Sequence, residues 1–272
     1  MPEFLWLLPA GFALGAYGTL IGAGGGFLLV PLLLLVYPSA SPHTVATISL
    51  TVVFFNALSG SIAYARMGRI DYKSGLLFST AAVPGAIVGA IATDRIPRRP
   101  FDFMVGVLML AICAFLLRRR AAGAPGEGGP WVLRRRLVEA DGTVYAYSYN
   151  PVLAVGVSLG VGFLSSLLGI GGGIIHVPVM ANLLHFPVHV ATATSHFTLA
   201  IMTLTGVVVH GVEGDFTGAL GRIVPLAVGV AAGAQVGAQL ARWVRGVWII
   251  RALVFALAFV GVRLIVLGWH GG

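Results

Sequence analysis

Two short glycine runs are the residues whose type and spacing best suit ligand binding. The first is GAGGGFLLVP, residues 22–31, and the second is GIGGGIIHVP, residues 169–178. A helix that starts directly after such a run directs unpaired backbone N–H groups and the positive end of its dipole at the glycines. Glycine lets a ligand approach this backbone closely, as in known anion sites. The candidate anion-binding residues are Gly24, Gly25, Gly26, Gly171, Gly172 and Gly173. The alternative interpretation is that these glycines only allow helices to pack closely.

A hydroxyl-rich stretch follows each glycine run, VATIS at residues 45–49 and VATATS at residues 190–195. If these stretches begin the next helices, Thr47, Thr194 and Ser195 are candidates to donate hydrogen bonds to a bound oxyanion. Residues two apart cannot share one helical face, so not all of these hydroxyls can line one cavity. The competing interpretation is a hydrogen bond from each hydroxyl to the preceding helical turn, which is common in membrane helices.

Two histidines, His176 and His196, are ionisable residues placed well inside the apolar runs; the acidic residue within a run, Asp102, is only the second residue of the run 101–117. An ionisable group at membrane depth is expensive and is a functional candidate. Since imidazole titrates near neutrality, either residue is expected to pair with an anion or to carry a proton. His176, within about two helical turns of the second glycine run, is the first choice for the residue that governs the pH dependence of binding, and His196 is the second. The alternative is a hydrogen-bonded histidine that serves only in packing.

The composition places these residues in a membrane protein. Of the 272 residues, 58% are hydrophobic and only 10% are charged, against about 25% charged in soluble domains. Such a chain has too little polar material for the surface of a soluble enzyme or a nucleic-acid-binding domain. The single cysteine, Cys113, excludes an internal disulfide and a thiolate metal site. We therefore expect a lipid-embedded protein without cofactor, metal or nucleic-acid partner.

Two long blocks, residues 4–65 and 142–212, contain no Asp, Glu, Lys or Arg. The apolar runs fit single membrane spans at residues 45–64, 72–93, 101–117, 188–210, 220–241 and 248–267, since a helix needs about 20 residues to cross a bilayer. Residues 4–37 and 151–186 are too long for one span and too short for two. Each contains one of the glycine runs, so we expect a broken, re-entrant helical hairpin covered by protein at membrane depth.

The two blocks are copies of one unit. The glycine runs match at an offset of 169 − 22 = 147, and GAIVGA at residues 85–90 matches GAQVGA at residues 233–238 in the same order. Repeats of this kind are typical of secondary transporters, whose site lies where the halves meet. The predicted fold is an all-α polytopic protein with two repeats, residues 1–117 and 151–272, each a broken hairpin plus three transmembrane helices.

A polar linker, residues 118–150, separates the repeats, and its Asp141-Gly142 between β-prone runs predicts a β-hairpin. If the broken hairpins are re-entrant, the halves are inverted, and one face receives 12 of the basic residues while the other receives 4. The positive-inside bias then places the linker in the cytoplasm and both termini outside. If each broken element crosses fully, the halves are parallel and the bias is weaker.

The glycine pair, each run ending in Pro and followed by an Ala-Thr stretch, resembles the TauE/SafE sulfite exporter family over both repeats but not over the linker. The resemblance implies export of sulfite or a small organosulfonate across the bacterial inner membrane, with sulfite as the first choice. The residues themselves leave a passive channel for an anion or neutral solute open. A cation or metal carrier is disfavoured, because such ions favour oxygen or sulfur ligands and the interiors of the spans offer neither carboxylates nor a pair of thiolates. Proton coupling is a further expectation, and no enzyme motif is present.

Overall fold

Each half of the chain begins with a helical hairpin that turns at a glycine run. In the computed structural model, which describes residues 2–37, 40–93, 95–117, 132–212, 219–244 and 246–270, α1 (Pro2–Ile21) and α2 (Gly26–Val36) flank the first run. In the second half, α6 (Pro151–Leu168) leads through the second run to α7 (Gly173–Pro178), which continues as the π-helical η1 (Val179–Leu183). In each hairpin the arm after the glycines is much shorter than the arm before them.

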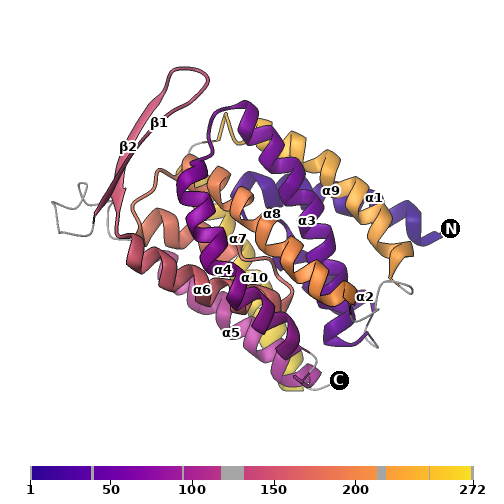
Figure 1. The fold of residues 1–272 in the computed structure, drawn as a ribbon. Coiled ribbons are helices and arrows are strands. Elements are labelled where there is room, and N and C mark those ends of the chain that lie inside the picture. Colours follow the sequence, from indigo (N-terminus) through magenta and orange to yellow (C-terminus); the bar gives the residue numbers. More distant parts are fainter. Residues whose placement is uncertain are drawn as a thin grey trace.

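Three further helices follow each hairpin, so the chain is an all-α polytopic membrane protein (Figure 1). Within the described residues, five helices are long and apolar enough to cross a membrane, namely α3, α4, α6, α8 and α9. The remaining long helices, α5 and α10, cover the other two expected spans. The bounds are α3 (Pro42–Arg66), α4 (Tyr72–Thr93), α5 (Arg98–Leu117), α8 (Val188–Val212), α9 (Leu220–Leu240) and α10 (Gly246–His270).

At two helix–helix contacts lined by glycines, which we call glycine seams, the hairpin of one half packs on a helix of the other. A Cβ atom on Gly85 of α4 would lie 2.1 Å from the carbonyl oxygen of Leu159 in α6, and one on Gly233 of α9 would lie 2.1 Å from that of Phe12 in α1. The two backbones therefore touch directly, as in small-residue helix pairs in membranes. The contacts show that α1 runs parallel to α9, and α6 parallel to α4. These seams explain why the GAIVGA and GAQVGA segments correspond.

The helix pairings are the same when each element is exchanged for its counterpart in the other half. α1 packs on α9 as α6 packs on α4, α3 packs on α9 as α8 packs on α4, and α3 and α8 pack on each other, as do α5 and α10. This correspondence supports a duplicated unit. The re-entrant character of the hairpins and the inverted orientation of the repeats relative to a bilayer stay predictions.

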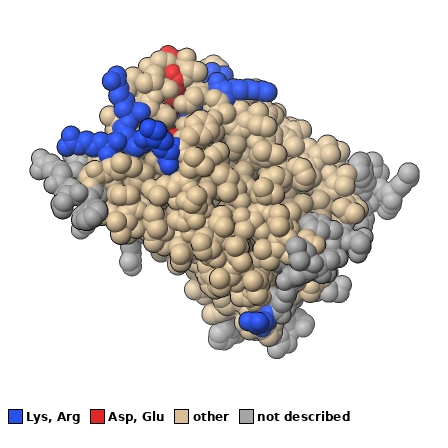
Figure 2. All heavy atoms as spheres, in the orientation of Figure 1, with Lys and Arg blue, Asp and Glu red and all other residues tan. Residues whose placement is uncertain are grey.

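A two-stranded antiparallel hairpin, β1 (Leu133–Val138) and β2 (Val144–Tyr149), stands at one end of the bundle (Figure 1). Gly142 in its turn has φ of 87°, a conformation that suits glycine. The hairpin expected in the linker is thus present, while the first arginine cluster of the linker, residues 118–120, lies outside the described residues. We call this end of the molecule the hairpin face; Figure 2 shows basic side chains gathered there above a broad uncharged surface.

Candidate functional site

The two glycine turns meet in the interior, where each helical hairpin reaches the other half. A Cβ atom on Gly26 would lie 2.4 Å from the carbonyl oxygen of Ile170, and one on Gly173 would lie 2.5 Å from that of Gly22. Those on Gly24 and Gly171 would both meet Val53 and Leu199, which lie near the middles of the 25-residue helices α3 and α8. The turns therefore cross at mid-depth of the helical bundle.

The backbone at the first turn leaves donors unused. Gly24 and Gly25 have φ values of 75° and 77°, so residues with side chains would be strained there. The N–H groups of Ala23 and Gly24 bond to the carbonyl oxygen of Gly18 at 2.9 and 3.2 Å. The N–H groups of Gly25 and Gly26 have no acceptor among the described residues. Donors of this kind at the start of a helix favour an anion.

The second turn also leaves backbone N–H donors without acceptors. Gly171 has φ of 68°, and the carbonyl oxygen of Gly172 accepts from Ile175 and His176 in the first turn of α7. The N–H groups of Gly171, Gly172 and Gly173 have no acceptor within the described part of the chain. All six candidate glycines are buried, and the space beside their Cα atoms is filled by neighbouring backbone and side chains. The turns are therefore closed on each other in this structure.

A chain of side-chain hydrogen bonds ties α8 to the first turn. Ser195 donates to the carbonyl oxygen of Gly22 at 3.2 Å, and His196 Nε2 lies 3.2 Å from the Thr19 hydroxyl. Thr19 donates to Asn56 Oδ1 at 2.7 Å, and Asn56 Nδ2 donates to the carbonyl oxygen of Gly24 at 2.8 Å. Two of the candidate residues, Ser195 and His196, thus lie beside a glycine turn.

The other polar candidates have partners elsewhere. Thr47 donates to the carbonyl oxygen of His43 at 2.9 Å, the bond to the preceding turn that was the alternative interpretation for it. Thr194 accepts from the backbone N–H of Asp71 at 3.0 Å. His176 is buried, with Nε2 3.4 Å from the Ser158 hydroxyl and its ring stacked on Phe78 at 6.5 Å. Their assignment to an anion site stays a prediction.

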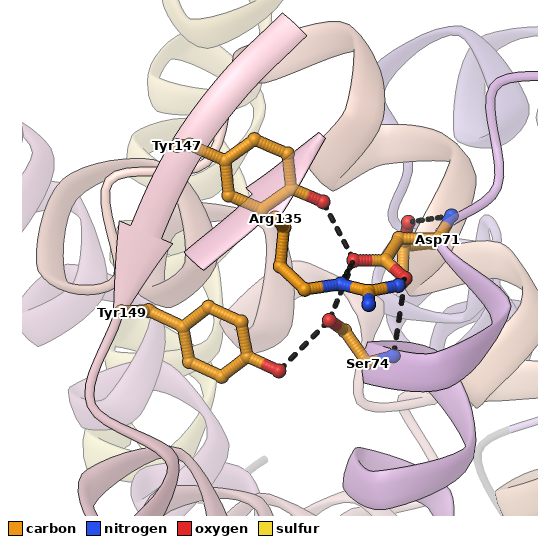
Figure 3. Close-up of polar contacts among 6 residues, drawn as sticks. Asp71, Ser74, Arg135, Tyr147 and Tyr149 are labelled. Carbon is orange, nitrogen blue, oxygen red and sulfur yellow. Dashed lines mark hydrogen bonds and ion pairs between the residues drawn. The ribbon is translucent and has the colours of Figure 1, made fainter. Parts of the chain in front are cut away.

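A second polar cluster, which the sequence did not indicate, joins the β-hairpin to the start of α4 (Figure 3). Asp71 precedes α4 and accepts from Ser74 N at 3.2 Å and from the Ser74 hydroxyl at 2.6 Å. Arg135 of β1 pairs with both of its carboxylate oxygens, and Tyr147 of β2 donates to Oδ2 at 2.7 Å. Tyr149 donates to the Ser74 hydroxyl at 2.8 Å. The hairpin is thereby fixed to the membrane helices.

Signals for this cluster are present in the sequence but are indirect. Asp71 and Ser74 have the spacing of a helix N-cap, and tyrosines alternate along VYAYSY so that Tyr145, Tyr147 and Tyr149 share one face of the strand. Arg135 is the middle residue of an arginine triplet, residues 134–136. Its register partner is Tyr147, and both side chains converge on the buried carboxylate of Asp71.

Hydrogen bonds outweigh burial in setting the pKa of the Asp71 carboxyl. Burial alone would raise the pKa of this carboxyl, but the hydrogen bonds from Arg135, Ser74 and Tyr147 lower it to about 2. A carboxyl whose pKa is lower in the folded state contributes stability that is fully present above its unfolded pKa, near 4, and is lost as pH falls towards 2.

We expect Asp71→Asn to destabilise the protein by about 2 kcal/mol or more at neutral pH, because Arg135 loses its charged partner. The stability difference from the original protein is expected to shrink as pH falls from 4 to 2. Thermal unfolding of the purified protein across this range measures both effects. Asp141→Asn is the control, since Asp141 is exposed and bonds only its own turn at Thr143 N. An unchanged difference between pH 4 and 2 would contradict the role of the charged carboxylate.

The described residues contain no group of three or more His, Cys, Asp or Glu side chains that could hold a metal ion. The expectation of a site without metal or cofactor stays an expectation. The chemistry that the arrangement offers is the binding of a small anion by backbone N–H groups, hydroxyls and imidazole.

Comparison with known proteins gives a family match over nearly the whole chain. A family model described as "Sulfite exporter TauE/SafE" matches residues 7–264. The "Probable membrane transporter protein YunE" of Bacillus subtilis is 32% identical over 269 residues, which cover 97% of each chain. The "Probable membrane transporter protein MJ0441" of Methanocaldococcus jannaschii is 28% identical over 76% of this chain and 73% of its own. No solved structure matches the chain significantly.

Proposed function

Since the chain belongs to the TauE/SafE sulfite exporter family and is a multi-pass membrane transporter, we propose that it is a secondary transporter of a small sulfur oxyanion or organosulfonate. Sulfite is the first choice, and the direction is export across the bacterial inner membrane. The family match supports the substrate class. The observation that carries the mechanism is the meeting of two glycine turns, one from each half, at mid-depth of the bundle.

In this proposal the anion binds between the turns. The unused N–H groups of Gly25, Gly26, Gly172 and Gly173 supply donors without a formal charge, which suits an ion that must also be released. Ser195 and His196 bound the same region through their bonds to Gly22 and Thr19. Thr47, Thr194 and His176 stay in the proposed site as residues that reach the anion only after the helices move.

The closed packing of the turns favours a transporter over a passive channel. A Cβ at Gly26 or Gly173 would be within 2.6 Å of atoms from other elements, so the two turns lie in direct contact in this conformation and leave no room for an anion beside these two glycines. Anion binding therefore requires the two halves to separate locally, which is a step of alternating access. An always-open channel would need no such step.

The orientation follows from the proposed membrane placement. The hairpin face carries Arg66, Arg69, Arg242 and the hairpin arginines (Figure 2), and an excess of basic residues favours the cytoplasmic side. The parallel pairing of α1 with α9, which ends at the hairpin face beside Arg242, directs the start of α1 towards the opposite face. This supports a cytoplasmic linker and an N-terminus outside.

We expect proteoliposomes that contain the protein to take up or release sulfite and methanesulfonate, and an imposed pH gradient to change the rate. Impermeant maleimide labelling of Thr143→Cys, in the exposed hairpin turn, reports the orientation of the vesicles. Flux of both anions that is independent of the pH gradient and linear in concentration would show a channel. Absence of flux for every sulfur oxyanion tested would refute the substrate class.

A further inference from the structure

A polar cavity of about 220 Å³ opens on the hairpin face, between the ends of α3 and α9 and the turn of the β-hairpin. Its lining includes no residue of the glycine turns or of the Asp71 cluster. Pockets for drug-sized ligands measure roughly 300–1,000 Å³, so this cavity suits a small ion. Its charged and amide side chains are Arg66, Arg69, Glu139, Asp141, Gln235, Gln239 and Arg242.

The charges of the cavity leave a basic excess. Arg69 Nε donates to Glu139 Oε2 at 2.9 Å, and both side chains are buried, with 8% and 3% exposed. Asp141 accepts from the backbone N–H of Thr143 at 2.9 Å, so its carboxylate is held by the hairpin turn. Three guanidinium groups thus face two carboxylates, of which Glu139 pairs through Oε2 while its Oε1 has no hydrogen-bond partner among the described residues. Arg66 and Arg242 form no ion pair with any described residue.

Arg69 has a buried donor without a partner. Its NH1 atom has no hydrogen-bond acceptor among the described residues, although the residue is only 7% exposed. A guanidinium has five N–H donors and no acceptor, and a buried charged donor without a partner is costly. An oxyanion in the cavity is the type of ligand that would complete its hydrogen bonding.

The cavity adjoins the polar chain at the first glycine turn. Ala63 of α3 lines the cavity, and the next residue, Tyr64, donates to the carbonyl oxygen of Thr19 at 2.8 Å. The Tyr64 ring meets the ring of His196 edge to face at 5.6 Å. One turn of α3 further in, Gly60 lies against the imidazole of His196. A single helical turn therefore separates the cavity from residues at the proposed anion site.

We propose that this cavity is an oxyanion vestibule, a second binding site that holds the transported sulfur oxyanion at the hairpin face before it reaches the glycine turns. The proposal rests on the proposed function for the identity of the ligand. Arg69 and Arg242 bind the anion, Gln235 borders it, and Glu139 holds Arg69 in place. Tyr64 separates the vestibule from His196 and Thr19.

A cysteine placed in the vestibule gives a local measure of binding. Gln239→Cys lies on the lining and is exposed, and its rate of alkylation by N-ethylmaleimide is followed in nanodiscs of neutral phosphatidylcholine. The native Cys113 is buried in α5, and protein without the new cysteine gives the background. Methanesulfonate is the probe, because its charge is constant across the working pH range. It is expected to slow alkylation in a saturable way.

The methanesulfonate concentration that gives half of the maximal protection from alkylation is expected to rise about tenfold with Arg242→Gln. The double variant Arg69→Gln with Glu139→Gln is expected to show a similar rise, because each variant removes a charged hydrogen-bond donor. The paired change avoids leaving Glu139 charged and buried alone. Arg136→Gln is the matched control, since Arg136 is exposed on the same hairpin but does not line the vestibule. It is expected to leave protection unchanged.

The outcomes separate the vestibule from the transport function. If methanesulfonate is transported but does not slow alkylation, the vestibule is overturned and the transporter stays in place. The same holds if Arg242→Gln and Arg136→Gln weaken the protection from alkylation equally. Protection that depends on Arg69 and Arg242 without any flux supports the site and refutes the transporter. Protection that appears only when phosphatidylglycerol replaces the neutral lipid identifies a lipid headgroup site and overturns the proposal.

Discussion

Gly26→Ala and Gly173→Ala are expected to abolish transport and to prevent recovery of a monodisperse protein. In each case the new methyl group would lie about 2.5 Å from a backbone carbonyl of the opposite turn. Backbone cannot rotate away as a side chain does, so the two turns must separate. Overpacking of this kind costs about 1–3 kcal/mol and sometimes more. Size-exclusion profiles and flux of the purified variants measure the result.

Gly172→Ala separates a steric role from a ligand role. Gly172 has φ of −66°, which suits alanine, and its Cβ would lie 2.5 Å from the terminal methyl of Met202 and 2.9 Å from Val161 Cγ1, so only side-chain atoms need to move. We expect this variant to fold but to lose most of its flux, because the methyl group occupies space beside the unused N–H groups. Gly156→Ala and Gly160→Ala, which meet nothing within 4 Å in α6, are controls expected to be normal. Normal flux in folded Gly172→Ala would leave the glycines a packing role only.

The helices and the glycine turns could be predicted because their signals are local. Apolar runs about 20 residues long fix the spans, and small residues at the same places in both halves, such as Gly85 and Gly233, mark the seams that the structure contains. The sequence does not say which helix lies across each seam. The pairing of α1 with α9 joins residues that are more than 200 positions apart, and no local pattern encodes it.

The polar contacts could be predicted only in part for the same reason. Ser195 and His196 lie beside a glycine turn, but Thr194, their neighbour, bonds the backbone of Asp71 just before α4. A step of one residue along a helix rotates the side chain by about 100°, so adjacent candidates face different elements. Asn56, a polar residue inside an apolar run, joins α3 to Thr19 and Gly24, a pairing that its own sequence neighbours do not encode.

The geometry favours His196 over His176 as the residue that couples pH to anion binding. The Thr19 hydroxyl donates to Asn56, so its oxygen accepts from His196 Nε2–H, and the neutral ring then carries its lone pair on Nδ1. That atom is buried and has no partner among the described residues. Protonation there would place a positive charge beside the first glycine turn, where an anion compensates it. His176 lies instead beneath the β-hairpin, against Phe78 and Ser158.

We therefore expect methanesulfonate to bind more tightly to the original protein as pH falls, and His196→Gln to remove this dependence. Gln retains hydrogen bonding to Thr19 but does not titrate, and binding at low pH is expected to weaken about tenfold for the loss of one charged hydrogen bond. By linkage, the bound anion favours the protonated ring by the same factor. Binding curves at several pH values for His196→Gln and His176→Gln provide the comparison, with thermal unfolding as the check of folding. If His196→Gln keeps the full pH slope and His176→Gln flattens it, proton coupling passes through the residues under the hairpin and not through the first glycine turn.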